Sequence, residues 1–499
     1  MSLILECYYQ PLSTLINPHQ PFETTTYKGS ASVLVATWER YRTHYLRAMF
    51  DNIRRFTFPL VGTAAAVLTI WLGYFAQRSQ FGSFLLVFGV FFALYLWVVF
   101  AQKEYVDDQR RYLWLGIGLR ALLLFSIPHF SDDFYRFLWD GRLTVAGWHP
   151  FTHPPDYFME NQIFPKGITP ELYGLLNSPQ YFTVYPPLCQ AVFAAAAWIA
   201  PDHIGAEVGI LKLFLLLCEA GTLYLLSKAR FAPRYAVAAY ALNPLLILEI
   251  TGNCHFEGAM IFFLIAGLVA LQKERLRLAA VCWAFATAAK MLPLLFLPVV
   301  WRWLGWRKGL IFNLVFGATC LVLFAPLLSV LPNILESLDL YFRQFQFNAS
   351  VYYLLREWGF ASQGYDMGEW LGPRLGAATF AGALLIALAW PMRNNRDIVS
   401  LAGAMLFTLL LYLSLSATVH PWYLTVPMAI SVLTRWRFAI LWSGLAALSY
   451  SHYAQGQFQE NFVLIAVEYG VLWFFIVWEI KRAILQMANG KQHGSSRIL

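Results

Sequence analysis

The sequence changes character abruptly where YLWLGIGLRALLLFSIP (Tyr112–Pro128) gives way, two residues later, to SDDFYRFLWDGRLTVAGWHPF (Ser131–Phe151). The first stretch is close to the length that a helix rising 1.5 Å per residue needs to cross about 30 Å of hydrocarbon. The second places three carboxylates and two arginines within twelve positions. A membrane crossing that ends in ionisable side chains indicates both the fold and the place where chemistry occurs.

The composition extends this interpretation to the whole chain. Of 499 residues, 59% are hydrophobic and only 13% are charged, so the polar surface of a water-soluble protein is missing. Apolar runs recur from about residue 58 to residue 480 without a polar gap of domain size. We therefore expect one all-α polytopic bundle with about 12 to 14 crossings.

The net charge of +8 does not indicate nucleic-acid binding, because most basic residues fall in short connections between apolar runs. Such residues mark cytoplasmic loops, and no nucleic-acid partner is predicted. With a cytoplasmic N-terminus, the expected organisation is a cytoplasmic segment at 1–57 with a basic interfacial helix at Trp38–Phe56, a transmembrane catalytic domain at 58–480 and a cytoplasmic tail at 481–499. Two long outer loops are expected at 129–206, with juxtamembrane helices, and at 329–373.

Two departures from regular crossings are expected. The orientation is consistent only if the run from Pro186 to Ala200 does not cross, so we interpret it as a half-helix or re-entrant segment. The runs on either side of Lys290, at 277–289 and 291–303, are short enough to be broken helices that reach an internal cavity.

The ionisable residues of the first outer loop form a pattern. If this stretch is helical, Asp132, Asp133, Arg136 and Asp140 lie on one stripe at spacings of three and four. An aspartate tuned by its neighbour could act as a general base on a hydroxyl, while Arg136, Arg142 or Lys290 neutralises an anionic phosphate leaving group. The competing interpretation is an interfacial helix whose ions only pair with one another.

Further ionisable residues are expected on the same outer side. His255 and Glu257 fall at a helix end, Lys290 interrupts an apolar run, and His420 stands beside a proline. Each has an ordinary structural explanation, such as a snorkelling lysine or a histidine that caps a turn. Because ionisable residues in or at the ends of crossings are costly, one polar site that gathers them is the simpler hypothesis.

Several blocks carry a resemblance to a known family. The acidic motif at Ser131–Phe151 is followed in order by VYPPL, NPLLILEITGNCHFEGA, AAKMLPLLFLP, FNASVYYLL and VHPWYL. In this set the chain resembles bacterial membrane glycosyltransferases of the GT-C fold, in particular polyprenyl-phosphate-mannose-dependent mannosyltransferase-like proteins. The resemblance spans about residues 60–480, and the acidic motif is its most diagnostic feature.

The resemblance implies an inverting hexosyltransferase that moves a sugar, in such proteins mannose, from a polyprenyl phosphate to an acceptor at the periplasmic face of the inner membrane. It places the catalytic carboxylates at Asp132 and Asp133, with Asp132 in the leading position. Arg136, Arg142 and Lys290 are assigned to the donor phosphate. His149 replaces the asparagine expected in the family pattern. The residues assigned to the substrate cavity are Asp140, His149, Tyr185, His255, Glu257, Asn348 and His420.

The implied partners are the polyprenyl-phosphate sugar, membrane lipids and an acceptor that is a glycan, a lipid or a protein. No cofactor is predicted; an Asp pair is compatible with a divalent metal, but no further ligands complete a cage. Two other functions stay open: a polymerase or ligase of lipid-linked oligosaccharides, and a transporter or flippase. Transport sites lie near the bilayer midplane between repeats, whereas here the carboxylates crowd one outer loop.

Overall fold

The structure is a computed structural model that describes residues 57–101, 109–343, 345–392, 397–454 and 458–495. The interfacial helix expected at Trp38–Phe56 lies outside these residues. By its contacts the chain divides into two units, Met1–Leu60 and Val61–Leu499. All contacts described below lie within the second unit.

Seven helices of the described residues are long and apolar enough to cross a membrane, or eight if one bent pair is a single span. The expected all-α polytopic architecture is confirmed. The first of these helices is Thr57–Tyr74. The others are α2 (Phe81–Leu96, extended by a π-helical turn at Trp97–Ala101), α8 (Ile204–Lys228), α14 (Trp306–Phe324) continuing through Ala325–Val330 into α15 (Leu331–Arg343), α17 (Gly368–Ala389), α18 (Ile398–Leu415) and α21 (Phe462–Ser495).

Other apolar runs fold as shorter pieces, which is why this number is below the 12 to 14 crossings expected. Proline removes an amide donor and breaks helices. Pro244 begins the helical segment Pro244–Gly252, and the chain bends by 114° between this segment and the next helix, Glu257–Gln272. The shorter elements are α3 (Gln109–Ala121), α9 (Ala236–Ala241), α10 (Pro244–Leu246), η4 (Ile247–Gly252), α11 (Glu257–Gln272), α12 (Leu276–Ala289), η5 (Leu292–Phe296), α13 (Leu297–Leu304), η7 (Pro421–Leu424), α19 (Thr425–Ser431), α20 (Phe438–Leu445) and η8 (Ala446–Tyr453).

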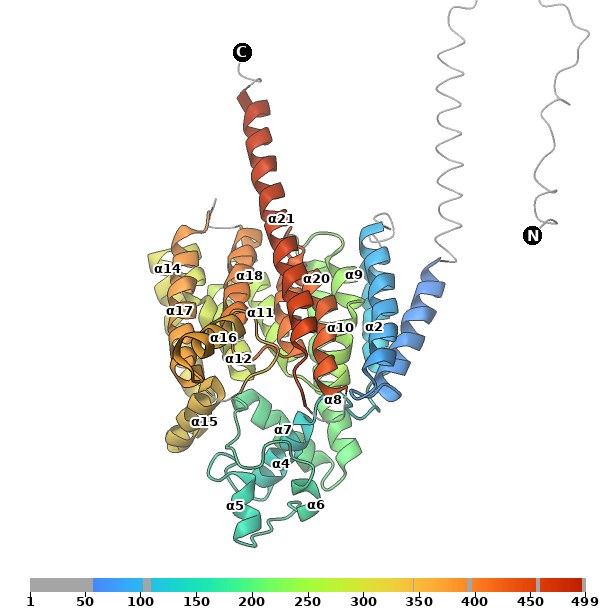
Figure 1. Ribbon diagram of the computed structural model, residues 1–499, viewed down its shortest axis with the longest axis vertical. Coiled ribbons are helices and arrows are strands. Elements are labelled where there is room, and N and C mark those ends of the chain that lie inside the picture. The colour runs from blue at the N-terminus through green and yellow to red at the C-terminus, as the bar shows by residue number, and fades with distance from the viewer. Residues whose placement is uncertain (1–56, 102–108, 344, 393–396, 455–457, 496–499) are drawn as a thin grey trace, which may run out of the picture. The chain divides into compact units, whose positions relative to one another are not determined.

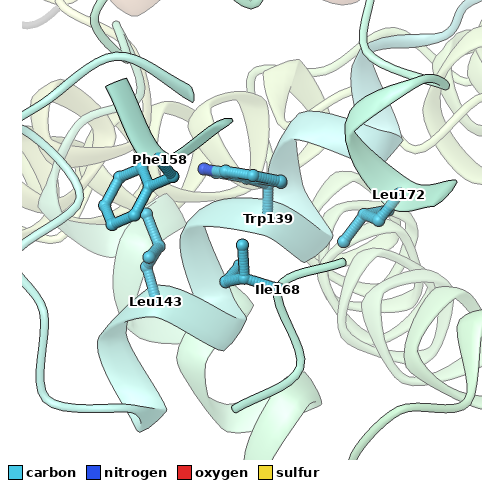
Figure 2. Packing of buried hydrophobic residues seen from close by; sticks show 5 residues of the cluster. All are labelled: Trp139, Leu143, Phe158, Ile168 and Leu172. Atoms are coloured by element: carbon cyan, nitrogen blue, oxygen red, sulfur yellow. The ribbon is translucent and has the colours of Figure 1, made fainter. Parts of the chain in front are cut away.

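The first predicted outer loop contains four short helices, α4 (Asp133–Val145), α5 (Pro155–Glu160), α6 (Pro170–Tyr173) and α7 (Pro187–Ile199). Figure 1 shows them gathered beyond one end of the longer helices. A small core joins α4, α5 and α6, and Figure 2 shows Trp139 and Leu143 of α4 facing side chains from the neighbouring segments. This core fixes α4 within its loop.

A glycine sets how closely α4 approaches α7. A Cβ atom at Gly141 would lie 2.4 Å from the carbonyl oxygen of Phe193, closer than real contacts permit. The rings of Phe137 and Phe193 stack beside this contact with centroids 4.5 Å apart. The position of α4 therefore depends on a backbone contact that glycine permits.

The second predicted outer loop is also folded, with α15 and then α16 (Val351–Gln363). This loop and the helical turn Ala325–Val330 that leads into it are attached to the first loop by hydrogen bonds: the ring of His149 lies 3.2 Å from the carbonyl oxygen of Pro326, and the Asn333 amide donates to the carbonyl of Phe151 at 2.7 Å. Phe151 also packs against Leu327. The two loops thus form one layer.

A buried ion pair connects α3 to α8. The Arg120 Nε donates to Glu219 at 2.6 Å, and both side chains are fully buried. The remaining guanidinium nitrogens donate to the carbonyl oxygens of Gly116, Ala241 and Tyr240, and the Tyr240 hydroxyl donates to Glu219. Every hydrogen-bonding group of this pair has a partner, as a charge buried in a bundle requires.

Candidate functional site

The acidic pair lies at the start of α4. Asp132 occupies the N-cap position and Asp133 the first helical position, where exposed amide groups favour negative charge. The Arg78 guanidinium contacts the Asp132 carboxylate at 2.6 Å, and the Asp132 side chain is 36% exposed. The Asn177 amide donates to Asp133 at 2.9 Å. Both carboxylates are therefore held by a partner yet keep access to solvent.

Arg136 and Asp140 continue the predicted stripe and pair with each other at 2.9 Å. The other oxygen of Asp140 accepts from Thr183 and Gln190, so its carboxylate is enclosed by protein donors. One amine of Arg136, Nη2, is buried and has no hydrogen-bond partner among the described residues. Arg136 thus keeps a donor for a ligand, whereas Asp140 positions side chains.

Two nitrogens of Arg142, Nε and Nη2, donate to one oxygen of Glu207 on α8, Oε1, at 3.0 and 2.7 Å. Its remaining amine donates to the carbonyl of Gly167. Hydrogen bonds between two charged groups are stronger than those between neutral groups. Arg142, which we expected at the donor phosphate, attaches the first outer loop to α8 in this structure.

A cavity of about 400 Å³ lies between α11, η5, α17 and α18. Its walls are mostly apolar, with the phenol rings of Tyr352, Tyr412 and Tyr423 among them. Of the described residues that line it, only Glu257 and Lys290 are charged. The structure therefore brings two predicted site residues together in a hollow suited to an amphipathic ligand.

Lys290 owes its position to a break in the chain. It has extended backbone between α12 and η5, as its interruption of the apolar run predicts. Its ammonium lies 3.0 Å from Glu257 and 5.9 Å from the ring centroid of Tyr185. Burial opposes the charged form, but the Glu257 carboxylate outweighs it and raises the pKa of Lys290. Glu257 thus keeps the cation of the cavity charged.

Two predicted histidines enclose an indole. The rings of His255 and His420 stack on Trp422 with centroid distances of 4.0 and 4.2 Å. Since both are nearly parallel to it, they occupy its opposite faces. Among the described residues, His255 Nε2 and His420 Nδ1 are buried without a hydrogen-bond partner. Burial, together with nearby His255, Lys290 and His452, lowers the pKa of His420 to about 3.

The remaining predicted cavity residues have structural contacts. His149 attaches to Pro326, as described above. Asn348 is buried in the left-handed backbone region at φ 47° and its amide donates to Glu468. Tyr185 packs edge-on to Phe137, while its chain neighbours line the cavity.

Sequence reasoning missed several contacts of the acidic pair. Arg78 lies in the turn between the first two apolar runs, on the predicted outer side. A basic residue there departs from the usual inside location of such residues and was a usable signal. Asn177 carried no comparable signal, because its partner Asp133 lies 44 residues away in the sequence.

The low pKa of His420 predicts a loss of stability in acid. As pH falls from about 6.5 to about 3, His420 binds a proton in the unfolded chain but not in the folded protein. The free energy of unfolding therefore decreases by up to about 1.4 kcal/mol per pH unit. Thermal unfolding of purified protein between pH 7.5 and 4.5 should show a smaller pH dependence in His420→Gln than in wild type. His153→Gln controls for loss of an imidazole, and equal slopes in wild type and His420→Gln would contradict the assignment.

Comparison with known proteins relates this chain to a family of membrane mannosyltransferases. Residues 57–305 match the family described as Alpha-(1->6)-mannopyranosyltransferase, N-terminal domain. The chain is 23% identical over 254 residues to Alpha-(1->6)-mannopyranosyltransferase B of Corynebacterium glutamicum. That alignment covers 44% of this chain and 41% of the relative, so the chain spans about two fifths of the length of the curated protein that it matches.

Together, the helical fold and these matches define a mannosyltransferase-like membrane protein, which confirms the resemblance inferred from the sequence motifs. The match to this family covers about half of the chain, residues 57–305. This half contains the acidic motif, Arg136, Glu257 and Lys290.

Proposed function

We propose that this protein is a GT-C glycosyltransferase that transfers a hexose, mannose by analogy with its relative, from a polyprenyl phosphate to an acceptor hydroxyl at the periplasmic face of the bacterial inner membrane. The observation that carries the proposal is the family match over residues 57–305, which includes the acidic motif and the cavity residues Glu257 and Lys290. The proposal assigns no cofactor or metal to the reaction.

In the proposed reaction an acceptor hydroxyl attacks the anomeric carbon on the face opposite the phosphate. The new glycosidic bond forms as the bond from that carbon to the phosphate oxygen breaks, so the configuration inverts. The hydroxyl proton passes to Asp132 or Asp133, and the electron pair of the broken bond leaves on the polyprenyl phosphate. Cations placed where this charge develops lower the barrier.

The cavity supports a lipid donor. Its apolar walls suit the first isoprene units, and Lys290 stands at its polar side, where it could pair with the phosphate. Glu257 holds Lys290 in place at 3.0 Å. The unpartnered amine of Arg136 is a second candidate donor to the phosphate.

Mass analysis of acceptors after incubation tests the function. Purified protein in nanodiscs is mixed with polyprenyl-phosphate mannose, polyprenyl-phosphate glucose or GDP-mannose, each with membrane extract. We expect a hexose to be added to an acceptor from a lipid-linked donor but not from the nucleotide sugar. Transfer from GDP-mannose in membranes freed of polyprenyl phosphate, or no transfer from any donor, would contradict the proposal.

Removal of the cavity cation should weaken donor binding. Lys290→Met is expected to raise the KM for the polyprenyl-phosphate sugar by roughly 10- to 100-fold, since a hydrogen bond to a charged group contributes about 1.5–3 kcal/mol. Lys290→Met/Glu257→Gln, which removes the carboxylate left behind, should not restore the KM. Lys166→Met, which removes an exposed lysine of the first outer loop, is the matched control; an unchanged donor KM in Lys290→Met would reject the assignment.

A further inference from the structure

A second hollow of about 390 Å³ lies where α2 and α21 begin. Its lining differs from that of the apolar cavity, since it includes Ser451, His452, Gln459, Glu460 and Asn461. We propose that this polar pocket binds the sugar end of a neutral glycan acceptor. The proposal rests on the proposed function, because it supplies the second substrate of the same reaction.

Two buried polar atoms at this pocket lack hydrogen-bond partners among the described residues, Ser451 Oγ and His452 Nε2. The side chains belong to residues that are 8% and 1% exposed. A buried polar group without a partner costs about 1–3 kcal/mol. Two such atoms beside one hollow therefore indicate a polar ligand that satisfies them.

The hydrogen bonding of His452 determines whether its free ring nitrogen is a donor or an acceptor. The backbone N–H of Asn461 donates to His452 Nδ1 at 3.0 Å, so the neutral ring carries its proton on Nε2. Nε2 is thus a donor that requires an oxygen acceptor. The Ser451 hydroxyl both donates and accepts, which matches the hydroxyl groups of a sugar.

The pocket adjoins the acidic pair. The Arg78 guanidinium that binds Asp132 at 2.6 Å lies 5.0 Å from the ring centroid of Tyr453, the residue after His452. Phe81, three residues after Arg78, forms part of the pocket wall. A sugar held there would lie on the same side of the molecule as the proposed base.

A single segment separates the two hollows. Phe347 forms a β-bridge with Thr418, which lines the apolar cavity. The Phe347 ring also lies 5.1 Å from the ring of His452, which lines the polar pocket. The two hollows therefore lie on either side of the segment that contains Phe347. Such an arrangement would let donor and acceptor approach a reacting carbon from opposite sides.

The charge of the pocket selects among acceptors. Its described lining contains a carboxylate, Glu460, and no lysine or arginine. Glu460 is already engaged by the backbone amide of Asn348 and the hydroxyl of Tyr353. A negative wall without a paired cation disfavours a phosphorylated acceptor and favours an uncharged glycan.

The test uses three variants in nanodiscs. Ser451→Ala removes a hydroxyl that has no partner among the described residues, and His452→Asn keeps an acceptor near the Nδ1 position while removing Nε2. Ser449→Ala is the matched control, because its hydroxyl donates within the same helix to Ala446 and it is absent from the pocket lining. The probe is α-1,6-linked mannobiose, with mannose 6-phosphate as the anionic comparison.

We expect Ser451→Ala and His452→Asn each to raise the acceptor KM by about 3- to 10-fold, the effect of one hydrogen bond, with the donor KM unchanged. Ser451→Ala should melt at the wild-type temperature or above. Saturation-transfer NMR should show mannobiose bound to wild type and to Ser449→Ala, weaker binding to both pocket variants, and no binding of mannose 6-phosphate.

The outcomes separate this inference from the proposed function. If wild type transfers a hexose but the pocket variants match Ser449→Ala in acceptor KM and NMR signal, the pocket assignment is wrong and the function stands. If wild type transfers nothing, the function fails, while loss of mannobiose signal in the pocket variants still supports a glycan site. Absence of signal with wild type overturns the pocket.

Discussion

Asparagine at Asp132 or Asp133 is expected to lower hexose transfer by about 10²–10⁴-fold in at least one of the two variants, the contribution typical of a general base. The amide is nearly isosteric with the carboxylate, so Asn177 and Arg78 keep an oxygen acceptor. The melting temperature should therefore change little. Initial rates with a polyprenyl-phosphate sugar, measured beside thermal unfolding, separate the two effects.

Glu160→Gln is the matched control, because it removes an exposed carboxylate from the same outer loop. It should transfer at the wild-type rate. Comparison of the two aspartates also identifies the base, since Asp132 is paired with Arg78 and Asp133 accepts a hydrogen bond from Asn177. Full activity in Asp132→Asn/Asp133→Asn would remove this pair from the mechanism.

Loss of Arg120 should be the most damaging single change to stability. Arg120→Leu leaves the Glu219 carboxylate buried without its cation, and breaking such a pair costs about 3–5 kcal/mol. Three backbone carbonyl groups also lose their donor. Denaturant unfolding in mixed micelles measures the loss.

Arg120→Leu/Glu219→Leu should recover part of that stability, because an apolar pair leaves no unpaired charge. Arg374→Leu, an exposed arginine that stacks on Trp370, is the control and should lose under about 1 kcal/mol. A loss in Arg120→Leu no larger than in Arg374→Leu would show that the buried pair does not stabilise the bundle.

The sequence predicted the helical class because apolar length is a strong local signal, and it predicted the short helices around Lys290 because a cation interrupts them. The sequence was less informative about where each helix breaks or ends. The apolar stretch around Pro244, for example, folds as the short pieces α9, α10 and η4. The last crossing was expected to end at residue 480, whereas α21 continues to Ser495.

The site was predicted in part for a related reason. Residue type and position along an apolar run identified Lys290 and Glu257, and the structure joins them in one cavity. The same reasoning could not tell which arginine has a donor left for a ligand. Arg136 keeps an amine without a partner among the described residues, whereas Arg142 is paired with Glu207. Partners more than sixty residues apart are determined by packing, and a single sequence holds little information about them.

Contact between α4 and α7 at Gly141 has an evolutionary consequence. The end of α4 that bears Asp132 is set by how closely two main chains approach, and a side chain at 141 would collide with the Phe193 carbonyl. Nine of the thirteen residues of α4 are buried, so its packing and the contact at Gly141 together keep the end that bears the acidic pair in register. We therefore expect selection at position 141 to act against any residue larger than glycine, whether charged or neutral. The position is constrained although its residue performs no chemistry.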